Sequence, residues 1–298
     1  MELRQLRYVL KVAEEKSFSR AADKVHIAQP SLSQQIIKLE KELGVQLFER
    51  QSGNIQVTYA GQRFIDQASK ILDQMELLKR EMQDMADMNK GQLIIGSLPI
   101  TGAHLLPLAL PILQKEFPGV ELILIEEKTS NLENLTARGQ TDVSLLSMPI
   151  KDPGLEVIPL LEEEILMVVP SNHPLSNKSE IALNECWNEP FIFLKKEQGF
   201  REISERLCRL AGFEPKVFFE SANLATVQSL VAAGMGITLI PKMVSKRQTV
   251  SSDLVYIPIN DVPAKRNLVL SYKKGRYLSK AAKSLISVMK SIVAEGNY

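Results

Sequence analysis

Hydroxyl and amide side chains gather at the start of one predicted helix near the N-terminus of this 298-residue chain. Such groups hydrogen-bond to base edges and phosphates when a helix enters a DNA groove. A solvated surface helix has the same pattern, so these residues alone leave both interpretations open. The polar face is predicted to hold Ser31, Ser33, Gln34, Gln35 and Lys38. The apolar stripe opposite it recurs at helical spacing and holds Leu32, Ile36, Leu39 and Leu43.

Two shorter amphipathic helices precede this segment. Their apolar residues recur at helical spacing in two sets, Leu3, Leu6, Leu10 and Ala13, then Phe18, Ala21, Ala22 and Val25. A break of a few residues ends at Gln29-Pro30, and proline is accepted in the first turn of a helix because its missing N–H has no partner there. Three such helices on one core predict a helix-turn-helix.

A hairpin and a long helix follow. Residues 45–50 and 54–58 are predicted strands around the turn signal Gln51-Ser52-Gly53, which gives a winged helix. Thr58 is placed to cap the helix predicted from Tyr59 to Asn89. Apolar residues along that helix alternate in steps of four and three, which is typical of a coiled-coil seam. They favour pairing with a second copy over packing on the chain's own domain: Phe64, Ala68, Ile71, Met75, Leu78, Met82 and Met85.

These motifs make the chain resemble the LysR-type transcriptional regulators over its whole length. The resemblance rests on Met1-Glu2-Leu3-Arg4-Gln5-Leu6, the Gln-Pro-Ser-Leu-Ser run from Gln29, Leu47-Phe48-Glu49-Arg50 and Val57-Thr58-Tyr59-Ala60-Gly61. It implies an N-terminal all-α winged helix-turn-helix with a long linker helix, and a C-terminal α/β effector domain of two lobes that resembles type 2 periplasmic binding proteins. The implied domains are residues 1–58, 59–90 and 91–298, with one lobe at about 91–161 and 268–298 and the other at about 162–267.

The resemblance also implies partners and DNA contacts. The partners are double-stranded operator DNA, a small-molecule effector, and further copies of the chain, as a homodimer through the linker helix and as a homotetramer. RNA polymerase is a further candidate. The wing tip, Ser52-Gly53-Asn54, lacks the basic residue that many members carry, and residues 1–89 are nearly neutral, so the helix bears more of the recognition. The implied DNA contacts are Gln29, Pro30, Ser31, Ser33, Gln34 and Arg50.

From about Gly91 onward, the spacing of the apolar residues along the chain changes. Buried-type strands alternate with helical stretches, which predicts a parallel sheet. Hydroxyl and amide groups follow strand ends at residues 97–101, 128–131 and 220–223, where helix N-termini favour anions. Ordinary helix capping explains each one alone. All three coincide with the effector cleft that the resemblance implies, at Ser97, Pro99, Thr101, Thr129, Ser147, Gly199, Phe200, Ser221 and Asn223.

The effector is expected to be a small anionic metabolite. Lys195, Lys196 and Arg201 lie near Gly199 in sequence and are candidates to counter a carboxylate, although a lysine pair is more often solvated surface. A thiol-based redox sensor that uses Cys186 and Cys208 is an alternative. The apolar residues around both cysteines favour buried, inert thiols instead.

Composition and motifs exclude several other classes. No apolar run of membrane-spanning length and no signal peptide are present, so a cytoplasmic, nucleoid-associated protein is expected. Three scattered histidines and the absence of hydrolase or phosphate-loop motifs predict no catalytic residues, no metal and no cofactor. A solute-binding or scaffold protein without DNA binding remains the competing class.

Overall fold

The computed structural model describes residues 1–51, 54–86, 91–196, 198–246 and 253–296. The chain divides into two compact units, Met1–Met85 and Ala86–Tyr298. Within the described ranges, none of the helices combines the length and the apolar character that crossing a membrane requires.

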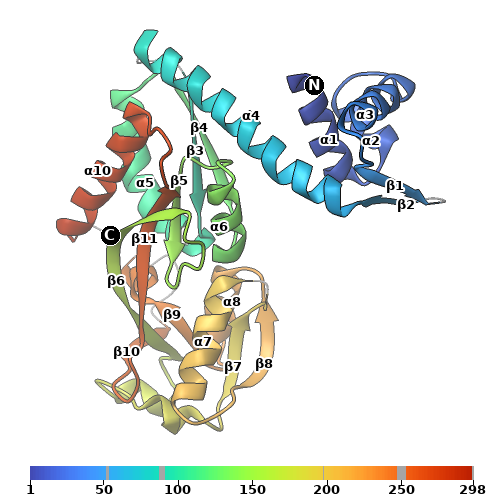
Figure 1. The fold of residues 1–298 in the computed structure, drawn as a ribbon. Helices are drawn as coiled ribbons and strands as arrows, with labels where there is room; N and C mark the ends of the chain where they lie inside the picture. The colour runs from blue at the N-terminus through green and yellow to red at the C-terminus, as the bar shows by residue number, and fades with distance from the viewer. Residues whose placement is uncertain (52–53, 87–90, 197, 247–252, 297–298) are drawn as a thin grey trace. The chain divides into compact units, whose positions relative to one another are not determined.

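The first unit is a three-helix core followed by a hairpin and a long helix (Figure 1). Side chains from all three helices and from the start of the hairpin share one apolar core, which includes Val9, Phe18, Leu32 and Phe48. The predicted winged helix-turn-helix is therefore the fold of this unit. Its elements are α1 (Leu3–Glu15), α2 (Phe18–Lys24), α3 (Gln29–Leu43), β1 (Phe48–Gln51), β2 (Asn54–Val57) and α4 (Tyr59–Ala86).

Local signals set the ends of these helices. Ser17 caps α2 by accepting a hydrogen bond from the N–H of Arg20 (3.3 Å). Gly44 ends α3 with a φ of 72°, a left-handed conformation that glycine adopts without the steric cost of a Cβ atom. The hydroxyl of Thr58 accepts a hydrogen bond from the N–H of Gly61 (2.9 Å), as predicted, and donates one to the carbonyl of Gln46 (2.7 Å).

The second unit is built on one long mixed sheet and a smaller parallel pair of strands. Its helices are α5 (Pro99–Glu116), α6 (Thr129–Ala137), α7 (Gly199–Leu210), α8 (Leu224–Ala232), α9 (Lys242–Lys246) and α10 (Lys280–Ala294), with 3₁₀ turns at Pro174–Asn177 and Leu183–Cys186. Its strands are β3 (Gly91–Ser97), β4 (Val120–Glu126), β5 (Val143–Ser147), β6 (Leu155–Pro170), β7 (Pro190–Leu194), β8 (Lys216–Ser221), β9 (Thr238–Pro241), β10 (Leu254–Pro258) and β11 (Lys265–Lys273).

The order of the long sheet is β10-β6-β11-β5-β3-β4, and β9 also pairs with β6. The predicted parallel pairing holds where β3 pairs with β4 and β5. By contrast, β11 is antiparallel to both β5 and β6. The reason is that the chain leaves the first lobe along β6 and returns to it along β11, so the two strands must run in opposite directions.

The two lobes of this unit are joined by these crossing strands. Residues 155–164 of β6 pair with β11, whereas residues 165–170 pair with β9 and β10 of the second lobe. Figure 1 shows β6 and β11 running between the lobe of β3, β4 and β5 and the lobe of β7 and β8. Any group held between β6 and β11 near this change of partner is therefore placed where both lobes meet.

Candidate functional site

The first candidate site is the outer face at the start of α3. Pro30 stands in its first turn, and Leu32, Ile36 and Leu39 are buried, as the periodicity predicts. The polar face therefore points away from the core of the first unit. Of the residues expected to contact DNA on this helix, Ser33 is half-buried, and the exposed ones are Gln29, Pro30, Ser31 and Gln34.

Gln35 differs from its neighbours on this face. Its side-chain oxygen accepts a hydrogen bond from Nε2 of Gln5 (3.3 Å), and Gln5 is buried in α1. Gln35 therefore connects α1 to α3 instead of joining the outer polar face, which the sequence pattern did not reveal.

The wing next to α3 is a short antiparallel ladder. Phe48 pairs with Val57, and the ladder runs to the pair Gln51 and Asn54. The backbone of Arg50 pairs with Ile55, while the Arg50 side chain and the wing tip, Ser52-Gly53, lie outside the described residues.

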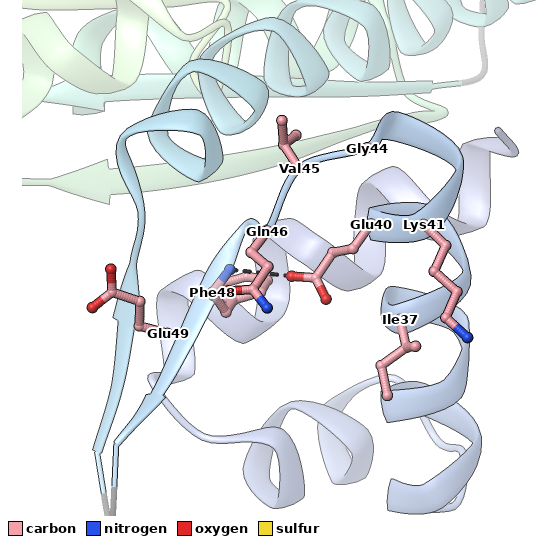
Figure 2. Close-up of a pocket in the computed structure, with 8 residues that line it drawn as sticks. All are labelled: Ile37, Glu40, Lys41, Gly44, Val45, Gln46, Phe48 and Glu49. Atoms are coloured by element: carbon pink, nitrogen blue, oxygen red, sulfur yellow. Dashed lines mark hydrogen bonds between the residues drawn. The ribbon is translucent and has the colours of Figure 1, made fainter.

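Glu40 holds the wing against the end of α3. Its Oε1 accepts hydrogen bonds from the backbone N–H groups of Leu47 (2.8 Å) and Phe48 (3.2 Å). Figure 2 shows this carboxylate pointing across a groove of about 670 Å³ toward the start of β1. Because Glu40 and Glu49 both line the groove, it does not suit a phosphate. The groove is lined by Ile37, Glu40, Lys41, Gly44, Val45, Gln46, Phe48 and Glu49.

The second candidate site is a cleft of about 550 Å³ in the second unit. That volume lies within the usual range for small-molecule sites. Side chains from both lobes line it, so a ligand held there touches elements on either side of the crossing strands. Five of the nine residues expected to bind effector line it together: Pro99, Thr129, Ser147, Gly199 and Phe200.

Three helix N-termini converge on this cleft. The first residues of α5, α6 and α7 are among its lining, at Pro99, Thr129 and Gly199. The N-cap residues of these helices are Leu98, Lys128 and Gln198, all within the described ranges. None of their side chains accepts a hydrogen bond from the first turn of its helix. By contrast, Asn223 caps α8 through Oδ1 (2.8 Å). Uncapped N–H groups and the positive ends of three helix dipoles make this cleft a favourable place for an anion.

The remaining four expected residues lie outside the lining. Ser97 and Thr101 are fully buried beside it, and Ser97 donates a hydrogen bond to the carbonyl of Leu98 (3.1 Å). Ser221 and Asn223 serve the turn before α8, where the Ser221 hydroxyl accepts from the N–H of Asn223 (3.1 Å). In this structure those two side chains act as turn and cap groups.

Two buried hydroxyls near the cleft have no hydrogen-bond partner among the described residues. They are Oγ1 of Thr101 and Oγ of Ser147, and Ser147 lines the cleft directly. A buried polar atom left unpaired costs free energy. The Ser147 hydroxyl is therefore a group that a bound ligand would satisfy.

The basic residues that line the cleft are not the ones that lie nearest to Gly199 in the sequence. Arg201 is buried and does not line the cleft, and its donors are taken up by Glu205 (2.7 Å), Glu220 (2.8 Å) and the carbonyl of Leu194 (2.7 Å). The basic side chains that do line the cleft are Lys128, Lys151, Arg206, Arg209 and Arg266. The acidic ones are Glu133, Glu202 and Glu205.

None of the basic candidates from the sequence, Lys195, Lys196 and Arg201, lines the cleft, whereas Arg266 does. It lies on β11, far along the chain from the other lining residues, and pairs with Glu163 of β6 (2.6 Å). Burial lowers the pKa of Arg266 from its ordinary value, and the neighbouring Glu163 carboxylate opposes that shift. Only the pairing of β6 with β11 brings this cation to the cleft.

The two cysteines are free thiols and both are fully buried. Burial raises the pKa of each thiol to about 12. Desolvation by burial is the largest cause for both thiols, and Cys186 also contributes to the raised pKa of Cys208. Among the described residues, no cluster of histidine, cysteine or acidic side chains could hold a metal ion.

A winged helix with an exposed polar recognition face, joined to a two-lobed unit with an anion-suited cleft, defines a ligand-responsive DNA-binding regulator. Comparison with known families gives the particular class. Residues 3–62 match the bacterial regulatory helix-turn-helix protein, lysR family, and residues 86–293 match the LysR substrate binding domain. The chain belongs to the LysR family of DNA-binding, effector-controlled transcriptional regulators.

Individual relatives span nearly the whole chain. An uncharacterized HTH-type transcriptional regulator of Bacillus subtilis, YcgK, is 38% identical over 97% of this chain and 94% of that protein. The DNA-binding transcriptional dual regulator OxyR of Escherichia coli is 32% identical over 98% of this chain and 95% of that protein. The structure of a full-length OxyR variant from Pseudomonas aeruginosa aligns with a TM-score of 0.75 and 26% identity, over 97% of this chain and 95% of that one.

Proposed function

We propose that residues 1–58 form the DNA-binding domain, 59–90 the dimerising linker and 91–298 the effector-binding domain. The first lobe of the latter takes in about 91–161 and 268–298, and the second about 162–267. The division of the chain near residue 85 supports the boundary before the effector domain. The change of partners along β6 near residue 165 supports the boundary between the lobes.

The proposed DNA contacts are the side chains at the start of α3 together with the wing. Gln34 reads base edges, because a glutamine amide both donates and accepts, and Ser31 and Ser33 bind phosphate or base edges. Gln29 and Pro30 set the entry of the helix into the major groove, and Arg50 contacts the backbone from the wing. The exposure of Gln29, Pro30, Ser31 and Gln34 on α3 supports this assignment.

The proposed assembly is a homodimer through α4, with a homotetramer as the complete form. Ile71, Leu78 and Met82 lie on one seam of α4 and are all exposed in the single chain. Apolar residues in coiled-coil register on an exposed helix bury that surface against a partner. Two recognition helices would then contact half-sites in successive major grooves.

The proposed effector is a small anion bound in the cleft of the second unit. The observation that carries this proposal is the convergence of three uncapped helix N-termini on a cleft with an excess of basic side chains. A ligand that touches both lobes there stabilises a closed arrangement over an open one. Its binding then shifts the populations of the two arrangements and hence the assembly that contacts DNA.

A second candidate follows from relatives named as hydrogen peroxide-inducible genes activators, at 33% identity over 92% of this chain. Peroxide reacts with the thiolate form of cysteine. With a pKa of about 12, roughly one thiol in 10⁵ is ionised at neutral pH, and neither Cys186 nor Cys208 is accessible. These properties favour ligand binding over thiol oxidation as the signal for this chain.

The proposed function has no catalytic step, and we place it in the cytoplasm at the nucleoid, where its DNA target is. Full-length protein should retain a small set of genomic fragments from a fragment library at moderate salt. Those fragments should contain imperfect inverted repeats. Retention of all fragments equally, or of none, would contradict specific operator binding and support the competing solute-binding class.

A further inference from the structure

Arg266 differs from the other basic residues of the cleft in how deeply its side chain is buried. The Arg266 side chain is only 3% exposed, whereas that of Arg209 is 50% exposed. An exposed cation is solvated and contributes little to binding an anion. A cation held in a dry, preorganised position contributes more, because no water screens it and no side-chain entropy is lost on binding.

Glu163 fixes the position of this guanidinium. Its Oε2 accepts from Nε (2.7 Å) and lies 2.6 Å from Nη2 of Arg266, and its Oε1 accepts from the N–H of Met243 (2.7 Å). Nη2 also contacts the sulfur of Met243 (3.7 Å). Among the described residues, these contacts use Nε and Nη2, which leaves the Nη1 side for a ligand. Glu163 thus fixes the edge of the guanidinium that carries Nε and Nη2, and the donors of Nη1 stay available.

Ser147 lies on the same face of the sheet as Arg266. Ser147 of β5 is paired with Leu268 of β11, and Arg266 is two residues before Leu268 on that strand. Side chains two apart on a strand share a face, and so do directly paired ones. Ser147, whose hydroxyl is unpaired, and Arg266 therefore project from the same face of the sheet, and both residues line the cleft.

The surroundings of this pair are apolar on one side. The guanidinium carbon of Arg266 lies 5.6 Å from the centre of the Phe200 ring, in the first turn of α7. A compact inorganic anion would leave this apolar wall unfilled, whereas an organic acid would cover it. Further apolar groups line the same cleft at Leu98, Pro99, Ile100, Pro149, Leu194 and Ile203.

We propose that Arg266 and Ser147 bind the carboxylate of an apolar organic acid, and that Arg266 is the residue that selects acids over their neutral analogues. This deepens the proposed effector site and rests on it. The carboxylate accepts from Nη1 of Arg266 and from the Ser147 hydroxyl, near the N-terminus of α7. The apolar body of the acid lies against Phe200. Because Glu163 already neutralises Arg266, the added charge is balanced by the three helix N-termini and the outer basic residues.

The test is direct binding to the full-length protein, by calorimetry, of benzoate, 3-phenylpropionate and octanoate, each beside its amide. At least one acid should bind, and its amide should bind about tenfold more weakly or worse. The double variant Arg266→Gln with Glu163→Gln keeps a neutral hydrogen-bonding pair in the buried site. It should weaken acid binding about tenfold or more and leave the amide unchanged.

A neighbouring ion pair on the same two strands, β6 and β11, provides a matched control. Lys265 and Glu162 also form an ion pair (2.7 Å), but their side chains are 52% and 56% exposed and neither lines the cleft. Lys265→Gln with Glu162→Gln should leave acid binding unchanged. Ser147→Ala removes only an unpaired hydroxyl, so it should fold normally and weaken acid binding about threefold or more.

Three outcomes would overturn the proposal. They are binding of none of the acids to the wild-type protein, equal binding of acid and amide, or undiminished acid binding by both the Arg266 and the Ser147 variants. If acids still bind these variants but no longer bind Phe200→Ala, the cleft remains the effector site and only the Arg266 assignment fails. Loss of operator retention by the wild-type protein would instead count against the regulator function.

Discussion

The recognition face of α3 and the cleft of the second unit are built in opposite ways. The face consists of residues close together on one helix, exposed and supported from behind by a core stripe. The cleft takes its lining from several helices and strands, and its central cation is buried in an ion pair between two strands. The face needs only a rigid helix, whereas the cleft needs the whole fold of its unit.

This difference separates two kinds of mutational effect. Replacing a side chain on the α3 face should remove one contact with DNA and leave the fold intact. Replacing one partner of the Arg266–Glu163 pair should leave an uncompensated buried charge, which disturbs the fold as well as the site. Substitutions in each region, together with a chemical treatment of the thiols, test whether the two sites respond in these two ways.

The largest effect is expected at the linker seam, which determines whether one or two α3 faces act together. Leu78→Glu places a carboxylate in the apolar seam and should convert dimers to monomers. Operator affinity should fall about 100-fold or more, because the two half-sites are then bound independently. Sedimentation and gel-shift measurements check both. Lys70→Glu, on an exposed part of α4 outside the seam, should leave the dimer in place, and a dimeric Leu78→Glu protein would contradict the seam.

On the α3 face itself, Gln34→Ala should weaken operator binding about tenfold, the usual range for one base contact, while binding to unrelated DNA stays the same. Competition binding at one fixed salt concentration measures both. Gln62→Ala, an exposed glutamine of α4, is the matched control. Equal losses on operator and unrelated DNA would mean that Gln34 contacts phosphate and does not read bases.

Near the end of α3, Glu40→Ala should lower the free energy of unfolding of the first unit by about 1–3 kcal/mol, because two backbone N–H groups lose a charged acceptor. Urea unfolding followed by circular dichroism measures the change. Glu49→Ala, in the same groove but exposed, should change it little. If both variants unfold alike, Glu40 does not hold the wing.

The smallest effect is expected at the cysteines. Mild peroxide treatment of the folded protein should leave both thiols free and operator affinity unchanged, since burial keeps them protonated. Thiol counting after unfolding should then find both. Formation of a disulfide between Cys186 and Cys208 in the folded protein would support the redox alternative.

Much of the first unit could be predicted from the sequence, because its signals are local. The periodic stripe of α3, the Thr58 cap and the hairpin each depend on neighbouring residues. Even there, the hydrogen bond between Gln35 and Gln5 could not be predicted, because its two partners come from different helices.

The cleft was predictable only in part, since its assembly depends on which strands pair. Residues at strand ends, such as Thr129 and Gly199, carry a local signal and do line the cleft. Arg266 carries none. It reaches the cleft because β11 returns between β5 and β6. Arg201 is only two residues from Gly199 in sequence, yet it does not line the cleft and is paired with Glu205 and Glu220.

The proposed regulation requires that a ligand in the cleft of the second unit controls DNA binding by the first. The most direct measurement is a footprint of the full-length protein on a retained genomic fragment, with and without an acid that binds the wild-type protein. A saturating acid should change operator affinity about fivefold or more, or alter the length of the protected region. The double variant of Arg266 and Glu163 should not respond. An unchanged footprint and affinity in the wild-type protein at saturation would show that the ligand in the cleft does not control DNA binding.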